Sequence, residues 1–196
     1  MSLVSNIKSM YELFGVAIRT GIKLIKYNPY NVAEYFRKQG ATIGEGCRLD
    51  IGFLAQNPYL VIIGNHVFVA QGVTFHTHDG GSWILKDVDP DFDIFGPIII
   101  EDNCLIGSKA HILPNVRIGK NSIVGAGSVV ISNVPPDSIV MGIPARIIGS
   151  SIKYRERCLE VWKTQRPPGY EKMNSKQKLQ ALEKQLMSIY ASQLKL

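Results

Sequence analysis

Apolar residues recur at every sixth position through the middle of this chain. The longest uninterrupted series runs Ile100, Ile106, Ile112, Ile118, Val124 and Val130. The same unit occurs earlier in "IGEGCR" (43–48), "IGNHVF" (63–68) and "VAQGVT" (69–74). A period of six fits neither the helical repeat of about 3.6 residues nor the alternation of an amphipathic strand. The pattern therefore indicates a structural repeat.

The repeat predicts short strands joined by tight turns, with one apolar side chain of each unit pointing inward. Three strands close a triangular coil of eighteen residues, so that Ile100 stacks on Ile118 and Ile106 on Val124. Stacked coils share hydrogen-bond ladders about 4.8 Å apart, and each buries its inner face against its neighbours. We expect a mainly β protein whose central domain, 41–149, is a parallel β-helix.

The repeat is interrupted once at length, between Phe75 and Ile100, by "HTHDGGSWILKDVDPDFDIFGP". Long loops inside a compact repeat are usually functional, because they cost ordering entropy and add no core. We expect an extruded loop at about 79–97 that covers a polar site. An acidic loop in contact with solvent is the alternative.

The segments "IGNHVFVAQGVTF", "IGSKAHILPNVRIGKNSIVGAGSVV" and "VPPDSIVMGIPARIIG" resemble the hexapeptide-repeat acyltransferases. Within that family, "THDGG" looks most like enzymes that O-acetylate sugars and polysaccharide precursors. The resemblance covers about residues 40–150. It implies a left-handed coil, a homotrimer with active sites between subunits, acetyl-CoA as the acyl donor, and no metal.

The resemblance places the catalytic histidine at His78. A neutral imidazole can take the proton of an acceptor hydroxyl, since its ordinary pKa lies near 6.5. His76, two residues earlier, is the competitor for this role and is otherwise an acceptor contact. Asp79 or an aspartate of the loop, such as Asp93, is expected to orient the imidazole or bind substrate. Asn57 is expected on the acceptor side.

The resemblance also places the donor groove. Ser108 and Ala126 match positions that contact pantetheine, Ser132 matches the adenosine end, and Arg146 in "GIPAR" is placed to meet a CoA phosphate. A purely structural role in the turns is the alternative for each. Leu105 stands where sugar acetyltransferases of this family often have an aromatic residue, which puts stacking against CoA in doubt.

Helices are expected on both sides of the repeat. The N-terminal segment, 1–40, contains a basic amphipathic stretch at 7–27 and a short helix at 31–38, which either cap the open end or rest on a membrane surface. The C-terminal segment, 150–196, predicts a helix at 151–165 and, after "RPPGY", a helix capped by Asn174 or Ser175 and ending near Leu194. Its leucine seam is expected to pack on its own or a neighbouring subunit.

Composition narrows the class of protein. The net charge of +6 lies in the flanking helices, without the ordered basic and aromatic face of a nucleic-acid binder. Cys47, Cys104 and Cys158 are an odd, scattered set, which favours free thiols and a cytoplasmic location. We expect no signal peptide, and the sequence contains no apolar run of about 20 residues.

Three other functions stay open at this level. The first is N-acetylation of an amino sugar nucleotide. The second is a zinc enzyme resembling the γ-carbonic anhydrases, although "HTH" followed only by the distant His111 does not reproduce three zinc ligands. The third is a non-catalytic trimerising module. The preferred acceptor is a free or lipid-linked saccharide.

Overall fold

The repeat folds as a stack of triangular coils. The computed structural model describes residues 27–52 and 54–194, which fall into two compact units, one ending at Ser151 and the other comprising the residues from Ile152 onward. The expected helix at 7–27 lies almost wholly outside the described residues. Among the described residues, no helix is long and apolar enough to cross a bilayer.

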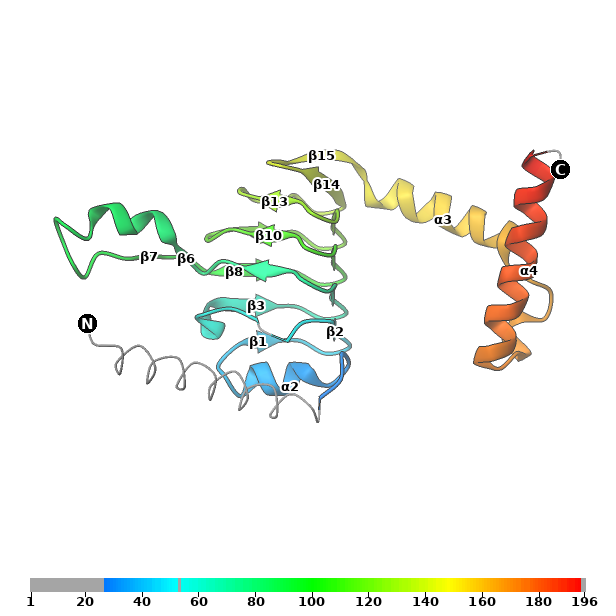
Figure 1. Ribbon diagram of the computed structural model, residues 1–196, viewed down its shortest axis with the longest axis horizontal. Helices are drawn as coiled ribbons and strands as arrows, with labels where there is room; N and C mark the ends of the chain where they lie inside the picture. Colours follow the sequence, from blue (N-terminus) through cyan, green and yellow to red (C-terminus); the bar gives the residue numbers. More distant parts are fainter. Residues whose placement is uncertain (1–26, 53, 195–196) are drawn as a thin grey trace, which may run out of the picture. The chain divides into compact units, whose positions relative to one another are not determined.

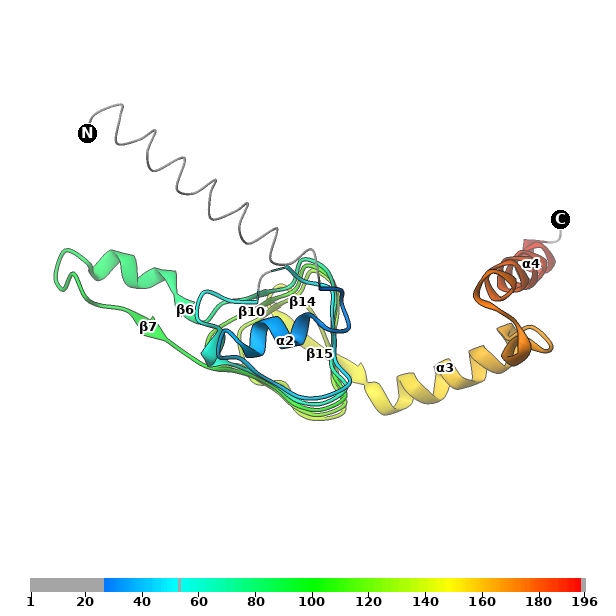
Figure 2. The same ribbon diagram turned by 90° about the horizontal axis from the view of Figure 1, so that it is seen from below.

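Parallel strands form three flat faces (Figures 1 and 2). The first face has the order β1-β3-β8-β11, and the third face has the order β13-β10-β5. The second face has the order β15-β14-β12-β9-β4-β2. Its strands are parallel except for β15, which returns antiparallel against β14 at the end of the stack.

The bounds of the strands follow the six-residue period. On the first face they are β1 (Thr42–Ile43), β3 (Val61–Ile63), β8 (Ile98–Ile100) and β11 (Arg117–Ile118). On the second they are β2 (Arg48–Leu49), β4 (Phe68–Val69), β9 (Leu105–Ile106), β12 (Ile123–Val124), β14 (Ser138–Gly142) and β15 (Ala145–Ser150). On the third they are β5 (Thr74–Phe75), β10 (His111–Ile112) and β13 (Val129–Val130).

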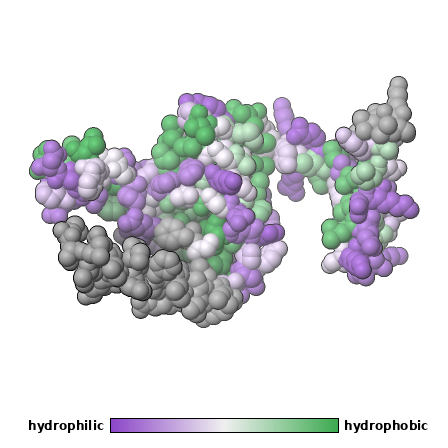
Figure 3. All heavy atoms as spheres, viewed as in Figure 1, coloured by the Kyte–Doolittle hydropathy of each residue, from purple (hydrophilic) through white to green (hydrophobic). Residues whose placement is uncertain are grey.

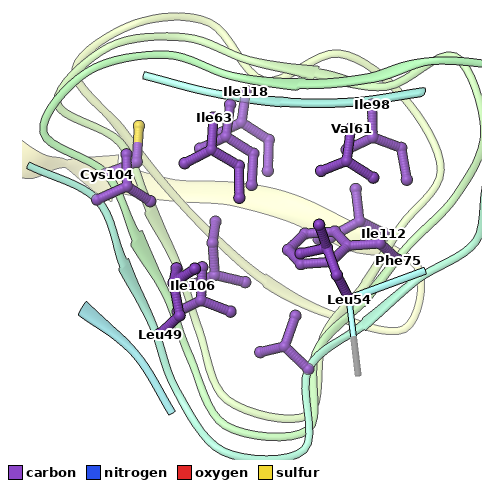
Figure 4. Close-up of a cluster of buried hydrophobic side chains, with 14 of the residues drawn as sticks. Leu49, Leu54, Val61, Ile63, Phe75, Ile98, Cys104, Ile106, Ile112 and Ile118 are labelled. Atoms are coloured by element: carbon purple, nitrogen blue, oxygen red, sulfur yellow. The ribbon is translucent and has the colours of Figure 1, made fainter. Parts of the chain in front are cut away.

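The predicted stacking register is confirmed. Ile100 pairs with Ile118 on the first face, and Ile106 pairs with Val124 on the second. These four side chains are buried, and the inner side chains of successive coils lie above one another in columns (Figure 4). Because inner positions stack on inner positions, the triangular interior is one continuous apolar core.

One corner, between the first and second faces, carries a ladder of polar side chains. His66, Asn103, Asn121 and Asp137 all have left-handed backbone angles there. The side chains join in series, from His66 Nδ1 to Asn103 Oδ1 (2.8 Å), Asn103 Nδ2 to Asn121 Oδ1 (2.9 Å), and Asn121 Nδ2 to Asp137 Oδ1 (2.8 Å). Asparagine and aspartate tolerate this conformation better than most residues, so the ladder both turns the chain and ties the coils together.

The interruption after Phe75 forms an arm that projects from the stack (Figures 1 and 2). Its base is a two-stranded antiparallel ribbon of β6 (His78–Asp79) and β7 (Ile94–Phe95), and the 3-10 helix η2 (Gly80–Leu85) lies between them. Trp83 and Val88 are among its exposed apolar residues, and hydrophobic and hydrophilic side chains are mixed on its surface (Figure 3).

Short helices complete the first unit. Helix α2 (Val32–Arg37) buries Val32, Ala33 and Phe36 in the same core as the coils and contacts β1. The 3-10 helix η1 (Pro58–Leu60) lies between β2 and β3. The short helix expected at 31–38 is therefore present, and it covers the first coil.

The second unit is helical. It comprises most of α3 (Ser151–Gln165), the 3-10 helix η3 (Tyr170–Lys172) and α4 (Ser175–Leu194). Asn174 Oδ1 accepts from the backbone N–H of Gln177 at 3.0 Å, and Gln177 Oε1 accepts from that of Asn174 at 2.9 Å. This reciprocal pair is a capping box. The seam residues Leu179 and Leu186 are exposed.

Candidate active site at the base of the arm

The chain leaves the third face at the corner where the arm begins. Phe75 is the last inward side chain of β5, and His76, Thr77 and His78 follow it. Because successive side chains of an extended chain point to opposite sides, buried Thr77 separates two half-buried imidazoles. The local alternation therefore presents both histidines on the outer side of this corner.

His76 makes a contact that the sequence analysis did not foresee. Its Nε2 lies 3.0 Å from Nδ1 of His111, and the two rings are inclined by 22° with centroids 5.3 Å apart. His111 opens β10, on the neighbouring coil, where its register partner in β5 is Thr74. Burial lowers the pKa of His76, and the nearby imidazoles of His111 and His78 lower it further.

His78 lies at the start of the arm. It is half-buried, and its ring centroid lies 6.5 Å from that of Phe95, its partner across the β6–β7 ribbon. Within the described part of the chain, Nδ1 of His78 is buried and has no hydrogen-bond partner. The partly exposed edge of the ring therefore presents Nε2.

Hydrogen bonds of Asn57 and Thr77 stabilise this corner on its inner side. The hydroxyl of Thr77 donates to Asn57 Oδ1 at 3.3 Å, and Asn57 Nδ2 donates to the hydroxyl of Tyr59 at 3.1 Å. Asn57 is thus bonded to the residue that separates the two histidines, and its place on the acceptor side stays a prediction. Its amide is already engaged by protein groups, which suits a supporting role.

The two candidate aspartates bind within the arm. Asp79 Oδ1 accepts from the backbone N–H of Gly81 at 2.9 Å and so caps η2. Asp93 accepts from the hydroxyl of Ser82 at 3.0 Å and from Lys86 Nζ at 3.2 Å. The hydrogen bonds from Lys86 and Ser82 lower the pKa of Asp93, and His78 adds a smaller electrostatic contribution. Neither carboxylate bonds to Nδ1 of His78, so the orienting role expected of them is not seen within this chain.

The candidate donor residues lie at a different corner. Ser108 and Ala126 are exposed on adjacent coils where the second face turns into the third, and the Ser108 carbonyl accepts from the N–H of Gly127 at 2.8 Å. A Cβ on Gly107 would lie 2.6 Å from the backbone nitrogen of Ala126. Glycine is therefore required at this position for the two turns to stack closely.

The remaining candidates are spread along the end of the stack. Ser132 is exposed after β13, and Arg146 is exposed on β15, where its Nη1 donates to the Ala145 carbonyl at 3.0 Å. Leu105 is half-buried on β9. The structure thus brings His76, His78 and Asn57 together, and it places the candidate donor residues elsewhere on the same chain.

The described residues do not meet the requirements of a metal site. Among the residues that the structure describes, no group of three or more His, Cys, Asp or Glu side chains could hold a metal ion. Two of the three nearby imidazoles, those of His76 and His111, are bonded to each other.

Known proteins similar to this chain share its repeat. Residues 97–132 match the family described as bacterial transferase hexapeptide (six repeats). Protein CapG of Staphylococcus aureus is 44% identical over 142 residues, which are 71% of this chain and 81% of CapG. This chain belongs to the hexapeptide-repeat acyltransferases.

Other members of the family are similar at lower sequence identity. The galactoside O-acetyltransferase of Escherichia coli is 34% identical over 54% of this chain and 52% of that enzyme, so the chain spans about half of its length. A hexapeptide-repeat acetyltransferase of Vibrio cholerae, solved in complex with acetyl coenzyme A, is 26% identical with a TM-score of 0.54, over 72% of this chain and 88% of that one. For a hexapeptide-repeat acyltransferase, these neighbours imply a left-handed β-helix.

Proposed function

We propose that this protein transfers an acetyl group from acetyl-CoA to a hydroxyl of a sugar or polysaccharide precursor, with His78 as the general base. The proposal is supported most directly by the imidazole of His78, which stands at the base of the arm with Nδ1 buried and its other edge open. The family, the galactoside-acetylating relative and the neighbour solved with acetyl coenzyme A support the reaction class.

The chemistry follows from the properties of a neutral imidazole. Nε2 of His78 takes the proton of the acceptor hydroxyl while the hydroxyl oxygen attacks the thioester carbonyl. The tetrahedral intermediate collapses with loss of the CoA thiolate, which recovers the proton from the imidazolium. A backbone N–H of a turn is the proposed donor to the oxyanion. No covalent acyl-enzyme forms in this scheme.

Nδ1 of His78 must carry the proton when Nε2 acts as base. That N–H is buried without a partner among the described residues, and leaving a buried donor unsatisfied costs about 1–3 kcal/mol. We propose that the partner comes from outside this chain, either from a neighbouring subunit or from bound substrate.

The assembly that we propose to complete the site is a homotrimer. His78 lies at the corner between the third and first faces, whereas Ser108 and Ala126 lie at the corner between the second and third. The two halves of the proposed site therefore lie at different edges of one stack. Packing the histidine corner of one subunit against the groove corner of the next completes the site, with Ser132 and Arg146 toward the adenosine and phosphate end.

Replacement of His78 by alanine tests the proposal. We expect kcat to fall by about 10²–10⁴-fold, the usual contribution of a general base, with the oligomeric state and the affinity for acetyl-CoA nearly unchanged. The measurement is thiol release from acetyl-CoA with a panel of hexoses, N-acetylhexosamines and sugar nucleotides.

The panel also separates the alternatives. His76→Ala is expected to keep most of kcat, so loss of turnover in His76→Ala alone, with His78→Ala active, would reverse the assignment. Acetylation confined to amino sugar nucleotides would replace O-transfer by N-transfer. Absence of CoA binding would favour a non-catalytic module.

A further inference from the structure

The contact between His76 and His111 leaves one nitrogen of each ring unused. Nε2 of His76 and Nδ1 of His111 share a single proton across their 3.0 Å contact. The outer atoms, Nδ1 of His76 and Nε2 of His111, make no hydrogen bond within the part of the chain that is described. His111 is exposed and His76 half-buried, so both rings border solvent.

The hydrogen bond between two neutral imidazoles determines whether each outer nitrogen is a donor or an acceptor. Each neutral ring carries one N–H and one lone pair. If the ring of His76 donates inward, its outer Nδ1 is an acceptor and Nε2 of His111 is a donor. If the ring of His111 donates inward, the two outer roles are exchanged. In either tautomer the pair presents one donor and one acceptor.

The surroundings favour the neutral form of His76. The charged or titratable groups that act on His76 are the imidazoles of His111, on β10, and His78, on β6, and both lower its pKa together with burial. The nearby carboxylate of Asp93 is bonded to Ser82 and Lys86, and that of Asp79 caps η2. Among the residues that the structure describes, the pair makes no hydrogen bond to a carboxylate.

A hydroxyl group is the ligand that suits such a pair, because it can donate or accept as the tautomer requires. A carboxylate or phosphate can only accept, and an ammonium group can only donate. His76 also lies two residues before His78, at the corner where the arm begins.

We propose that His76 and His111 form a hydroxyl-binding subsite that holds a hydroxyl of the saccharide acceptor adjacent to the one that is acetylated. In this proposal His111 binds substrate from β10, which lies on the coil next to the one that carries the arm. This inference rests on the proposed function, and it adds a basis for choosing a polyol over an anionic or cationic acceptor.

The test combines three variants of His111 with modified acceptors. His111→Ala removes both nitrogens, His111→Asn keeps a polar group near the position of Nδ1, and His111→Gln places one near the position of Nε2. With the best hexose of the panel as acceptor, we expect His111→Ala to raise the acceptor KM about tenfold, the effect of one lost hydrogen bond of about 1.4 kcal/mol. The KM for acetyl-CoA should not change.

Rescue distinguishes binding from a structural role. His111→Gln is expected to restore the acceptor KM to within about threefold, and His111→Asn is not, since only the outer nitrogen meets the acceptor. A monodeoxy hexose lacking the held hydroxyl should lose about tenfold in the wild-type protein and nothing further in His111→Ala. His66→Gln, the same change at a corner away from the arm, is the matched control and should alter neither KM.

The results that would contradict the proposed function differ from those that would contradict the hydroxyl-binding subsite. A wild-type protein that acetylates no hydroxylated acceptor would defeat the proposed function. A wild-type protein that is active, with His111→Ala unchanged in acceptor KM, would overturn the subsite alone. Full rescue by Asn and none by Gln, or a rise in the KM for acetyl-CoA instead, would also overturn it.

Discussion

The pKa of His76 links this single residue to the stability of the fold. Burial and two neighbouring imidazoles lower it from an ordinary value of 6.5. Below pH 6.5 the unfolded chain therefore binds a proton at this position that the folded chain resists, so the free energy of unfolding falls as the pH falls. Above pH 6.5 both states are neutral and this contribution is constant.

We therefore expect the unfolding midpoint of the wild-type protein to drop as the pH is lowered from 7.5 to 5.5. His76→Gln cannot take up the proton and should flatten the curve in that window. Thermal unfolding followed by circular dichroism at a series of pH values measures the difference. His66→Gln is the matched control, and an equal flattening in both variants would assign the effect to another group.

The sequence predicted that two histidines lie close together at the candidate site, but not which hydrogen bonds they make. The family motif places His78 and His76 together, and the structure agrees about their proximity. The contact between His76 and His111 depends on how the coil continues beyond the arm. It could have been found by pairing Phe75 with Ile112 across the insertion, which is the observed register.

At the scale of elements, the polar corner ladder makes a separate contribution to the stack. Asn121 occupies its middle, with side-chain hydrogen bonds to Asn103 and to Asp137, and its φ is 59°. The side chain therefore supplies two hydrogen bonds, and the residue also accommodates a left-handed backbone that alanine resists.

Replacing Asn121 separates these effects. We expect Asn121→Gly to destabilise the protein by about 1 kcal/mol through lost hydrogen bonds. Asn121→Ala adds the left-handed penalty and should cost about 2–3 kcal/mol in total. Urea denaturation of both variants gives the comparison. If alanine proved no worse than glycine, the backbone angle would carry no cost at this corner.

Strand order was predictable because the same positions are buried in every coil. Ile100 over Ile118 follows from the period alone. The arm has no such period, so nothing in its sequence predicted that Asp79 would pair with Ile94 or that Asp93 would bond to Ser82. Those contacts depend on the geometry of the turns in the arm, which the order of residue types does not specify.

At the scale of the whole molecule, the proposed trimer makes each active site a product of two chains. The histidine corner and the groove corner belong to different edges of one triangular stack. Two variants that are each inactive for a different reason can then complement one another. One is His78→Ala, and the other is Ala126→Trp, which fills the groove from an exposed position.

Co-expression of the two variants with different tags is expected to restore activity in mixed oligomers. With equal, random mixing, about one quarter of all interfaces, and about one third of those in mixed trimers, join an intact histidine to an intact groove. Activity of the doubly tagged oligomers, compared with either parent, is the measurement. Failure of purified mixed trimers to regain activity would place both halves of the site on one chain.

The pairing of β6 with β7 at the base of the arm allows the arm to be replaced as a unit. β6 and β7 leave and re-enter the coil side by side, and the ladders above and below continue in register, with Ile63 aligned to Ile100 and Phe75 to Ile112. Segments of different length and chemistry can accordingly be grafted at this point without disturbing the scaffold. A change in the arm can then alter the acceptor preference while the β-helix keeps its structure.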